Sequence, residues 1–212
     1  MLSLEYIIER YEHLIKKADK TFEETAEKYK EYVRCVLHCA DCCHAMFGLF
    51  LIEAYYIKNK FDKLDPEVQR AALERAKSAD VTLKEIEKKL RAEREKSENT
   101  AEQSLSMMRV RCPLLDDNDE CILYEYRPLT CRVYGIPTSI HGKAHVCNKS
   151  AFKPGSYYPV YNLDEAYQEL YYLSRQLLSW EAGKELDKAS LLISMSKCIS
   201  TPTDQLLAEV FK

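Results

Sequence analysis

The stretch RCVLHCADCCHAMF, residues 34–47, places four cysteines within nine residues of a 212-residue chain. The N-terminal sequence MLSLEYIIERYEHLIKK mixes apolar and acidic residues in a pattern that fits neither a secretory signal nor a transit peptide. No apolar run approaches the length of a membrane span. We therefore expect a soluble cytoplasmic protein, in which thiols stay reduced. Nine cysteines in such a protein indicate metal binding rather than disulfides.

Composition excludes some classes of function. The chain carries 31 basic and 34 acidic residues, and its formal net charge is -3. These charges are spread along the sequence, so we expect no basic face that could hold a nucleic acid backbone. A hydrophobic content of 46% is sufficient for one core of ordinary size, and we expect a single domain over residues 1–212.

Most of the chain has the pattern of amphipathic helices, which predicts a mainly α fold. Apolar residues at three- and four-residue spacing predict one helix from Leu2 to about Arg34 and a more apolar one over 45–62. Asp65 as N-cap and Pro66 begin a long helix or helix pair over 65–108, with a candidate bend at 78–82. Helices also follow over 163–212, the first of them from Leu163 to about Ala182.

The segment 111–162 differs from this helical frame. It has most of the prolines, three of the five glycines and no apolar periodicity. A loop of this length is unusual in a compact domain. It also holds four cysteines: Cys112, Cys121, Cys131 and Cys147. We therefore predict that a metal centre pins this irregular segment to the helices, with metal–ligand free energy replacing the hydrophobic burial that it lacks.

The two groups of cysteines form one candidate ligand set. If the first group were helical, Cys35, Cys39 and one of the adjacent pair Cys42 and Cys43 would share a face. Either the helix ends there, or the two adjacent thiols serve different metals. Thiolates are soft ligands, which favours iron–sulfur clusters or zinc, in one centre or two. The candidate ligands are Cys35, Cys39, Cys42, Cys43, Cys112, Cys121, Cys131 and Cys147.

These residues also carry a family resemblance. CADCC, followed by RCPLLDDNDECILYEYRPLTCRVYG, resembles the YkgJ-type cysteine-cluster family, which is named for a proposed zinc- or iron-chelating domain and is similar to flagellin lysine N-methylase. The family pattern is C-x-x-C-x-x-C-C, then C-P-x-L, C-x-x-Y and R-P-x-x-C-R. Cys35 departs from it, because three residues rather than two separate Cys35 from Cys39. The matching positions are Cys39, Cys42, Cys43, Cys112, Cys121, Tyr124, Arg127, Pro128, Cys131, Arg132 and Cys147.

Several residues near the cysteines have a predicted supporting role. Arg127 and Arg132 flank Cys131 with positive charge, which lowers a thiol pKa and partly neutralises an anionic cluster. Cys198 is interpreted as a core residue. Four histidines are interpreted as neighbours of the ligands rather than ligands: His38, His44, His141 and His145.

Three functions are compatible with this pattern. The first is a protein whose cysteines hold an iron–sulfur cluster for a structural or redox role, and 4Fe–4S is the cluster type that we favour. The second is a zinc-stapled scaffold that binds another protein through its long helix. The third, implied by the resemblance, is a methyltransferase-like enzyme, and enzymatic activity is left open. The spacing of Cys35, Cys39 and Cys42 matches the radical S-adenosylmethionine signature, but no alternation of strands and helices surrounds it, so we interpret that match as coincidence.

Overall fold

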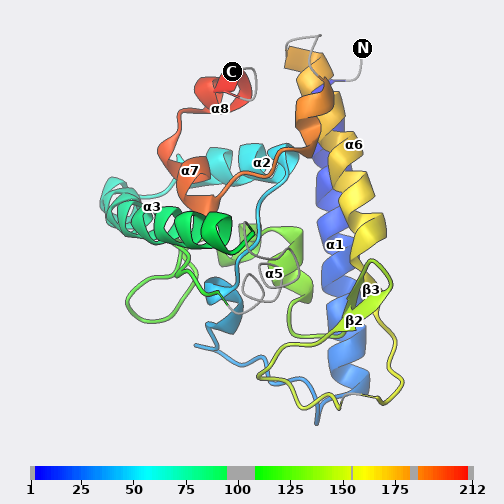
Figure 1. Ribbon diagram of the computed structural model, residues 1–212. Coiled ribbons are helices and arrows are strands. Elements are labelled where there is room, and N and C mark those ends of the chain that lie inside the picture. The colour runs from blue at the N-terminus through cyan, green and yellow to red at the C-terminus, as the bar shows by residue number, and fades with distance from the viewer. Residues whose placement is uncertain (1–2, 95–107, 154, 182–185, 210–212) are drawn as a thin grey trace.

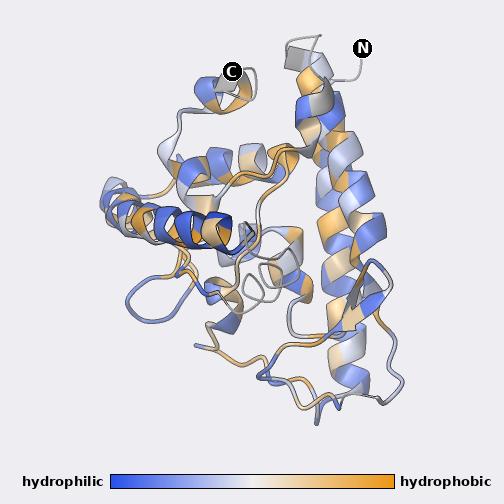
Figure 2. Cartoon of the chain, viewed as in Figure 1, coloured by the Kyte–Doolittle hydropathy of each residue, from blue (hydrophilic) through white to orange (hydrophobic). Residues whose placement is uncertain are grey.

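The computed structural model describes residues 3–94, 108–153, 155–181 and 186–209. The fold is mainly α, as predicted, with an irregular cysteine-rich segment between the helices (Figure 1). In Figure 2, the long helices show bands of hydrophilic and hydrophobic residues, as amphipathic helices do. The helices are α1 (Leu4–Lys28), α2 (Leu51–Phe61), α3 (Pro66–Arg94), α5 (Leu129–Val133), α6 (Leu163–Glu181), α7 (Met195–Ser200) and α8 (Thr203–Glu209).

Helix α1 is amphipathic and packs against α5 and α6. The side chain of Ser3 caps it by accepting a hydrogen bond from the backbone N–H of Tyr6 at 3.2 Å. Its buried face consists of Ile7, Tyr11, Ile15 and Ala18. The helix ends at Lys28, whereas the sequence predicted a helix to about Arg34. The chain has therefore left the helix before the first cysteine.

The next two helices also differ in part from their predicted bounds. Helix α2 begins at Leu51, because residues 45–50 are extended and form isolated bridges from Ala45 to Arg109 and from Leu49 to Ile193. Helix α3 is continuous through 78–82, so no break divides it into two helices there. The Asp65 carboxylate accepts from the Glu67 N–H at 2.8 Å, as expected of an N-cap. The remainder of the predicted segment, 95–107, lies outside the described residues.

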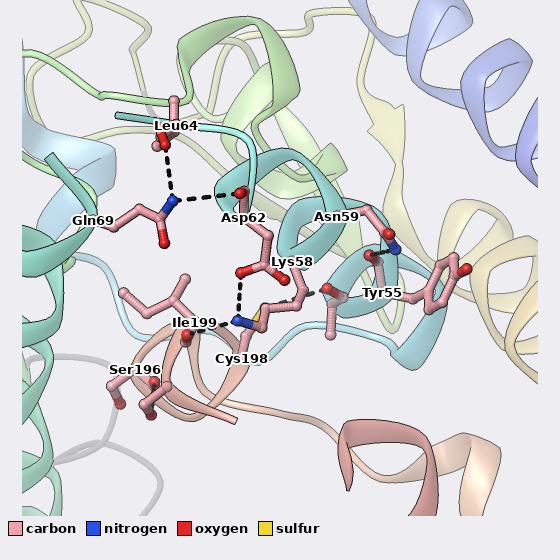
Figure 3. A network of polar contacts seen from close by, with 11 residues as sticks. Tyr55, Lys58, Asn59, Asp62, Leu64, Gln69, Ser196, Cys198 and Ile199 are labelled. Atoms are coloured by element: carbon pink, nitrogen blue, oxygen red, sulfur yellow. Dashed lines mark hydrogen bonds and ion pairs between the residues drawn. The ribbon is translucent and has the colours of Figure 1, made fainter. Parts of the chain in front are cut away.

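A buried lysine joins α2 to α7 (Figure 3). The Lys58 ammonium donates to the Asp62 carboxylate at 2.6 Å and to the backbone carbonyl of Ile199 at 3.3 Å. Beside it, the Cys198 thiol is fully buried and donates to the carbonyl of Ala54 at 3.3 Å, which agrees with the interpretation of Cys198 as a core residue. These contacts fix the C-terminal segment on the face of α2.

The segment 111–162 contains a small sheet in the order β2-β1-β3. Strand β1 (Thr138–Ile140) is antiparallel to β2 (Lys143–His145) and parallel to β3 (Tyr161–Asn162). His141 and Gly142 join β1 to β2 with φ values of 51° and 71°, the left-handed conformation that a two-residue hairpin turn requires. The hairpin ends shortly before Cys147.

The expectation that this segment lacks hydrophobic burial was wrong. Six of its apolar side chains are exposed by 2% or less: Leu114, Leu115, Leu123, Leu129, Val133 and Ile136. Their irregular spacing follows turns and short helices, so it matches neither the period of a helix nor that of a strand. Hydrophobic packing therefore contributes to the order of the cysteine-rich segment.

None of the helices described here is both long and apolar enough to cross a bilayer.

Replacing Lys58 by Met should lower the free energy of unfolding by about 1–3 kcal/mol, because it leaves the carbonyl of Ile199 without its donor in a buried place. Chemical denaturation measures this difference. Lys63→Met, at an exposed position, is the matched control and should change stability by less than about 0.5 kcal/mol. Equal stability of the two variants would contradict a stabilising role for the Lys58 contacts.

Candidate metal centre

The eight candidate ligands lie in four segments, at residues 35–43, at 112–121, at Cys131 and at Cys147. Backbone hydrogen bonds join the first two segments. After α1 the chain is irregular until a short 3-10 helix, η1 (Asp41–His44), which holds Cys42 and Cys43. The N–H of Cys112 donates to the carbonyl of Cys43 at 2.7 Å, and the N–H of Val110 donates to that of His44 at 3.0 Å. No α-helix runs through residues 35–43, so the helical spacing on which the alternative rested does not apply to Cys42 and Cys43. Whether both thiols bind one metal stays a prediction.

Five of the eight cysteines line one pocket of about 370 Å³. We call them the inner thiols: Cys42, Cys43, Cys112, Cys121 and Cys131. The other walls are mostly apolar and come from residues 45–49, from α3 and from the segment 192–196. The structure therefore brings together both adjacent cysteines of the first motif and three cysteines of the irregular segment.

The inner thiols interact electrostatically. Burial raises the pKa of Cys112 to about 12 and raises the pKa of Cys121 and of Cys131, and the charge of neighbouring thiolates adds to each shift. Cys42 is the exception, because a hydrogen bond from the Cys43 thiol lowers the pKa of Cys42 to about 7. The pKa of Cys43 rises correspondingly. A cation bound among these thiols would remove the repulsion that opposes their ionisation.

The other three cysteines, Cys35, Cys39 and Cys147, form a second group that we call the outer thiols. Burial raises the pKa of Cys35 to about 11, and the charges of Cys39, Cys147 and the inner thiol Cys42 are the next causes, so Cys35 lies within electrostatic reach of all three. A Cβ atom added at Gly135 would overlap the sulfur of Cys35. Cys35, the residue that departs from the family spacing, therefore has its thiol packed against the chain just after α5.

The two arginines predicted to support the ligands have different contacts. Arg127 lines the pocket and stacks on the ring of Tyr124 at 3.8 Å, and its charge lowers the pKa of Cys42 and of Cys121. Arg132 is buried and donates to the carbonyls of Arg127 at 2.9 Å and Glu125 at 2.7 Å.

The Arg132 guanidinium also pairs with the carboxylate of Asp19 on α1. Its bonds brace the loop before Cys131 against that helix. Arg127 thus acts on the thiols through its charge, whereas Arg132 fixes the backbone that presents one of them.

Sequence reasoning missed a buried carboxylate beneath the pocket, Glu53 of α2, which is 2% exposed. Glu53 accepts from the backbone N–H of Phe50 at 3.1 Å and from that of Leu129 at 2.9 Å. It therefore joins the start of α2 to the start of α5, two residues before Cys131. Burial raises its pKa from 4.5 to about 7. Its signal in the sequence is a single acidic residue inside the apolar run FLIEAYYI.

The four histidines have contacts of their own. His38 Nδ1 lies 2.9 Å from the carbonyl of Asn118, and His44 Nδ1 lies 3.0 Å from that of Ala40. His141 is paired with Asp164, and His145 is exposed on β2. These contacts are to backbone carbonyls and a carboxylate, and the interpretation of the histidines as neighbours of the ligands stays a prediction.

Among the residues that the structure describes, no three Cys, His, Asp or Glu side chains are already arranged as ligands of one metal ion. The donor set nevertheless fits a soft metal, because the pocket offers five thiols, and two arginines, Arg111 and Arg127, also line it. Short rotations of side chains on a braced backbone could bring thiols together, since three segments already meet there. The assignment of all eight cysteines as ligands stays a prediction.

The helical frame and its converging thiols define a cysteine-cluster protein suited to chelating a soft metal. Residues 34–148 match the model of the CxxCxxCC family, described as "Putative zinc- or iron-chelating domain". This match covers more than half of the chain, and the chain belongs to that family, as the YkgJ-type resemblance predicted. No curated protein and no solved structure matches the chain significantly.

The raised pKa of Glu53 predicts a pH-dependent stability. The folded state favours the neutral form of Glu53. The contribution of this group to the free energy of unfolding is therefore complete below pH 4.5 and is lost as the pH rises through about 7. Relative to Glu53→Gln, whose side chain cannot ionise, the unfolding free energy of the wild type should fall by about 3 kcal/mol across this window. Denaturant titrations of both proteins at several pH values measure this difference. If the unfolding free energies of the two proteins had the same pH dependence, the pKa of Glu53 would not be raised.

Replacing Gly135 by Ala should displace the thiol of Cys35, because the added Cβ overlaps its sulfur. Cys35 is exposed as a residue, and its thiol, once moved off Gly135, would be less desolvated and should react faster with iodoacetamide. Labelling rates at each cysteine, followed by peptide mass spectrometry, measure this change. Labelling of Cys198, which is buried elsewhere, is the internal control. An unchanged rate at Cys35 would show that its thiol does not lie against Gly135.

Proposed function

We propose that this protein holds an iron–sulfur cluster, of the 4Fe–4S type, through its inner thiols, for a structural or redox role. The observation that carries the proposal is the lining of a single, mostly apolar pocket by five cysteines. A 4Fe–4S cluster needs four cysteine thiolates, so the inner thiols supply a complete ligand set.

The cysteine spacing in the sequence favours a cluster over a zinc ribbon. A zinc ribbon carries two C-x-x-C pairs, whereas only Cys39 and Cys42 have that spacing here. Five thiols line one pocket, and a 4Fe–4S cluster takes one thiolate on each of its four irons.

The surrounding residues would control the properties of this group. When bound, a 4Fe–4S cluster supplies one-electron transfer and a rigid cross-link between its four ligands. The apolar walls would keep water from the sulfurs, and the positive charge of Arg127 beside Cys42 would favour the more reduced, more negative state. The cross-link would join η1 to the segment that follows α3 and to α5, all within one pocket.

Metal analysis tests the proposal. Protein purified without oxygen should contain about four iron and four acid-labile sulfide per chain at the inner thiols, with broad visible absorbance. Cys131→Ser should remove most of both. Cys198→Ser, a change of the same type at a cysteine outside the pocket, should retain them.

Circular dichroism separates the loss of a ligand from the loss of the fold in both variants. Colourless protein that contains zinc without sulfide would contradict the iron–sulfur assignment. It would instead favour a zinc-stapled scaffold, and the next search would then be for a protein that docks on it.

A further inference from the structure

Strand β2 forms an open edge of the small sheet. The strand order is β2-β1-β3, so β2 lies at an edge, and its three residues are all exposed. Ile140 and Lys143 close the two-residue turn and therefore exchange hydrogen bonds, whereas the next pair, Ser139 and Ala144, does not. The backbone N–H and C=O of Ala144 thus point away from β1. The outer side of β2 can therefore pair with another extended chain.

The segment that carries this edge has basic residues only. From Arg127 to Leu163 the sequence contains five Lys and Arg residues and no Asp or Glu. Its two arginines pair with Asp19 on α1. Its three lysines, Lys143 on β2 and Lys149 and Lys153 after it, are exposed. Lysine on an edge strand opposes pairing with a second copy of the same strand and favours an acidic one.

The segment after β2 is packed against the end of α1, which gives the basic surface a defined shape (Figure 1). The N–H of Ala151 donates to the carbonyl of Tyr32 at 2.8 Å. The ring of Phe152 stacks on that of Tyr32 with centroids 5.6 Å apart, and it meets the ring of Tyr158 edge-on at 4.9 Å. Tyr157, in the same segment, is 95% exposed and can contact a partner.

These features favour a protein segment over a lipid surface or a nucleic acid. An open backbone edge needs hydrogen-bonding groups, which the hydrocarbon of a membrane does not offer. Three exposed lysines are few for a nucleic acid backbone, because proteins that bind it neutralise several phosphates at once. An extended peptide supplies backbone donors and acceptors, and its Asp or Glu side chains supply the opposite charge.

We propose that the open edge of β2 binds an extended acidic segment of a partner protein, which adds to the three-stranded sheet as a further strand. Ala144 makes the backbone hydrogen bonds to this segment. Lys143, Lys149 and Lys153 attract its acidic side chains. The inference is independent of the proposed cluster, because none of these groups belongs to the inner thiols.

Binding of a defined peptide tests the proposal. The probe is a capped peptide of alternating Glu and Thr, which is acidic and forms strands readily. In an NMR titration of the full chain, it should cause saturable shifts of the backbone amides of β2, with the largest at Ala144. Binding should weaken as the salt concentration rises. A control peptide of alternating Lys and Thr should bind at least about tenfold more weakly.

Two substitutions at one position separate strand addition from charge attraction. Ala144→Pro removes the outward N–H and leaves the hydrogen bonds to β1 in place, so it should weaken binding of the acidic peptide about tenfold. Ala144→Thr keeps the N–H and suits a strand, so its affinity should match that of the wild type. Circular dichroism and thermal unfolding show whether each variant is folded.

The lysines are tested together. Replacing Lys143, Lys149 and Lys153 by Gln should weaken binding of the acidic peptide about tenfold and remove most of its salt dependence. This protein changes only exposed side chains, so it tests the site even if Ala144→Pro disturbs the hairpin.

The results distinguish this partner from the others and from the proposed function. Equal affinity of Ala144→Pro and Ala144→Thr for the acidic peptide would overturn strand addition. No saturable binding of that peptide, or binding only to phosphatidylserine vesicles or to single-stranded DNA, would overturn the acidic protein partner. Because these measurements do not involve iron or sulfide, their outcome and that of the metal analysis can each fail without the other.

Discussion

The hydrogen bonds of one buried carboxylate set the relative position of the two elements on which the inner pocket depends. Glu53 accepts the N–H of Phe50 and the N–H of Leu129, so the first turns of α2 and α5 share one acceptor group. Both donors would otherwise lack an intrahelical partner. Because α5 is only five residues long, it has little intrinsic stability, and this contact helps to hold its first turn beside the start of α2.

A second set of polar contacts, made by Arg132, holds the loop that precedes Cys131. Arg132 binds two backbone carbonyls of the loop and the carboxylate of Asp19, while Leu123, Leu129 and other apolar side chains pack underneath. The backbone around Cys131 is thus fixed by protein contacts. Ligands positioned by such supporting contacts lose less entropy on binding.

The features predicted well from the sequence were those with a strong local signal. The long helices have three- and four-residue periodicity, the Asp65 cap has its expected bond, and the cysteine spacing identified the family. The early end of α1 and the late start of α2 were missed, because residues 45–50 pair with segments distant in sequence.

The role of Glu53 was missed for a related reason. It depends on a partner far along the chain, Leu129, and one acidic residue gives no periodic signal. The buried apolar residues of the irregular segment are likewise fixed by tertiary contacts. Local patterns therefore predicted the helices and the candidate ligands, but not the way in which the ligands are supported.

The hydrogen bond between Cys112 and Cys43 joins two stretches that lie far apart in sequence. Residues 45–49 and α3, which lie between them along the chain, also line the pocket. Contacts between residues so distant in sequence form more slowly than helices, because loop closure costs entropy. The pocket is accordingly one of the last parts of the fold to assemble.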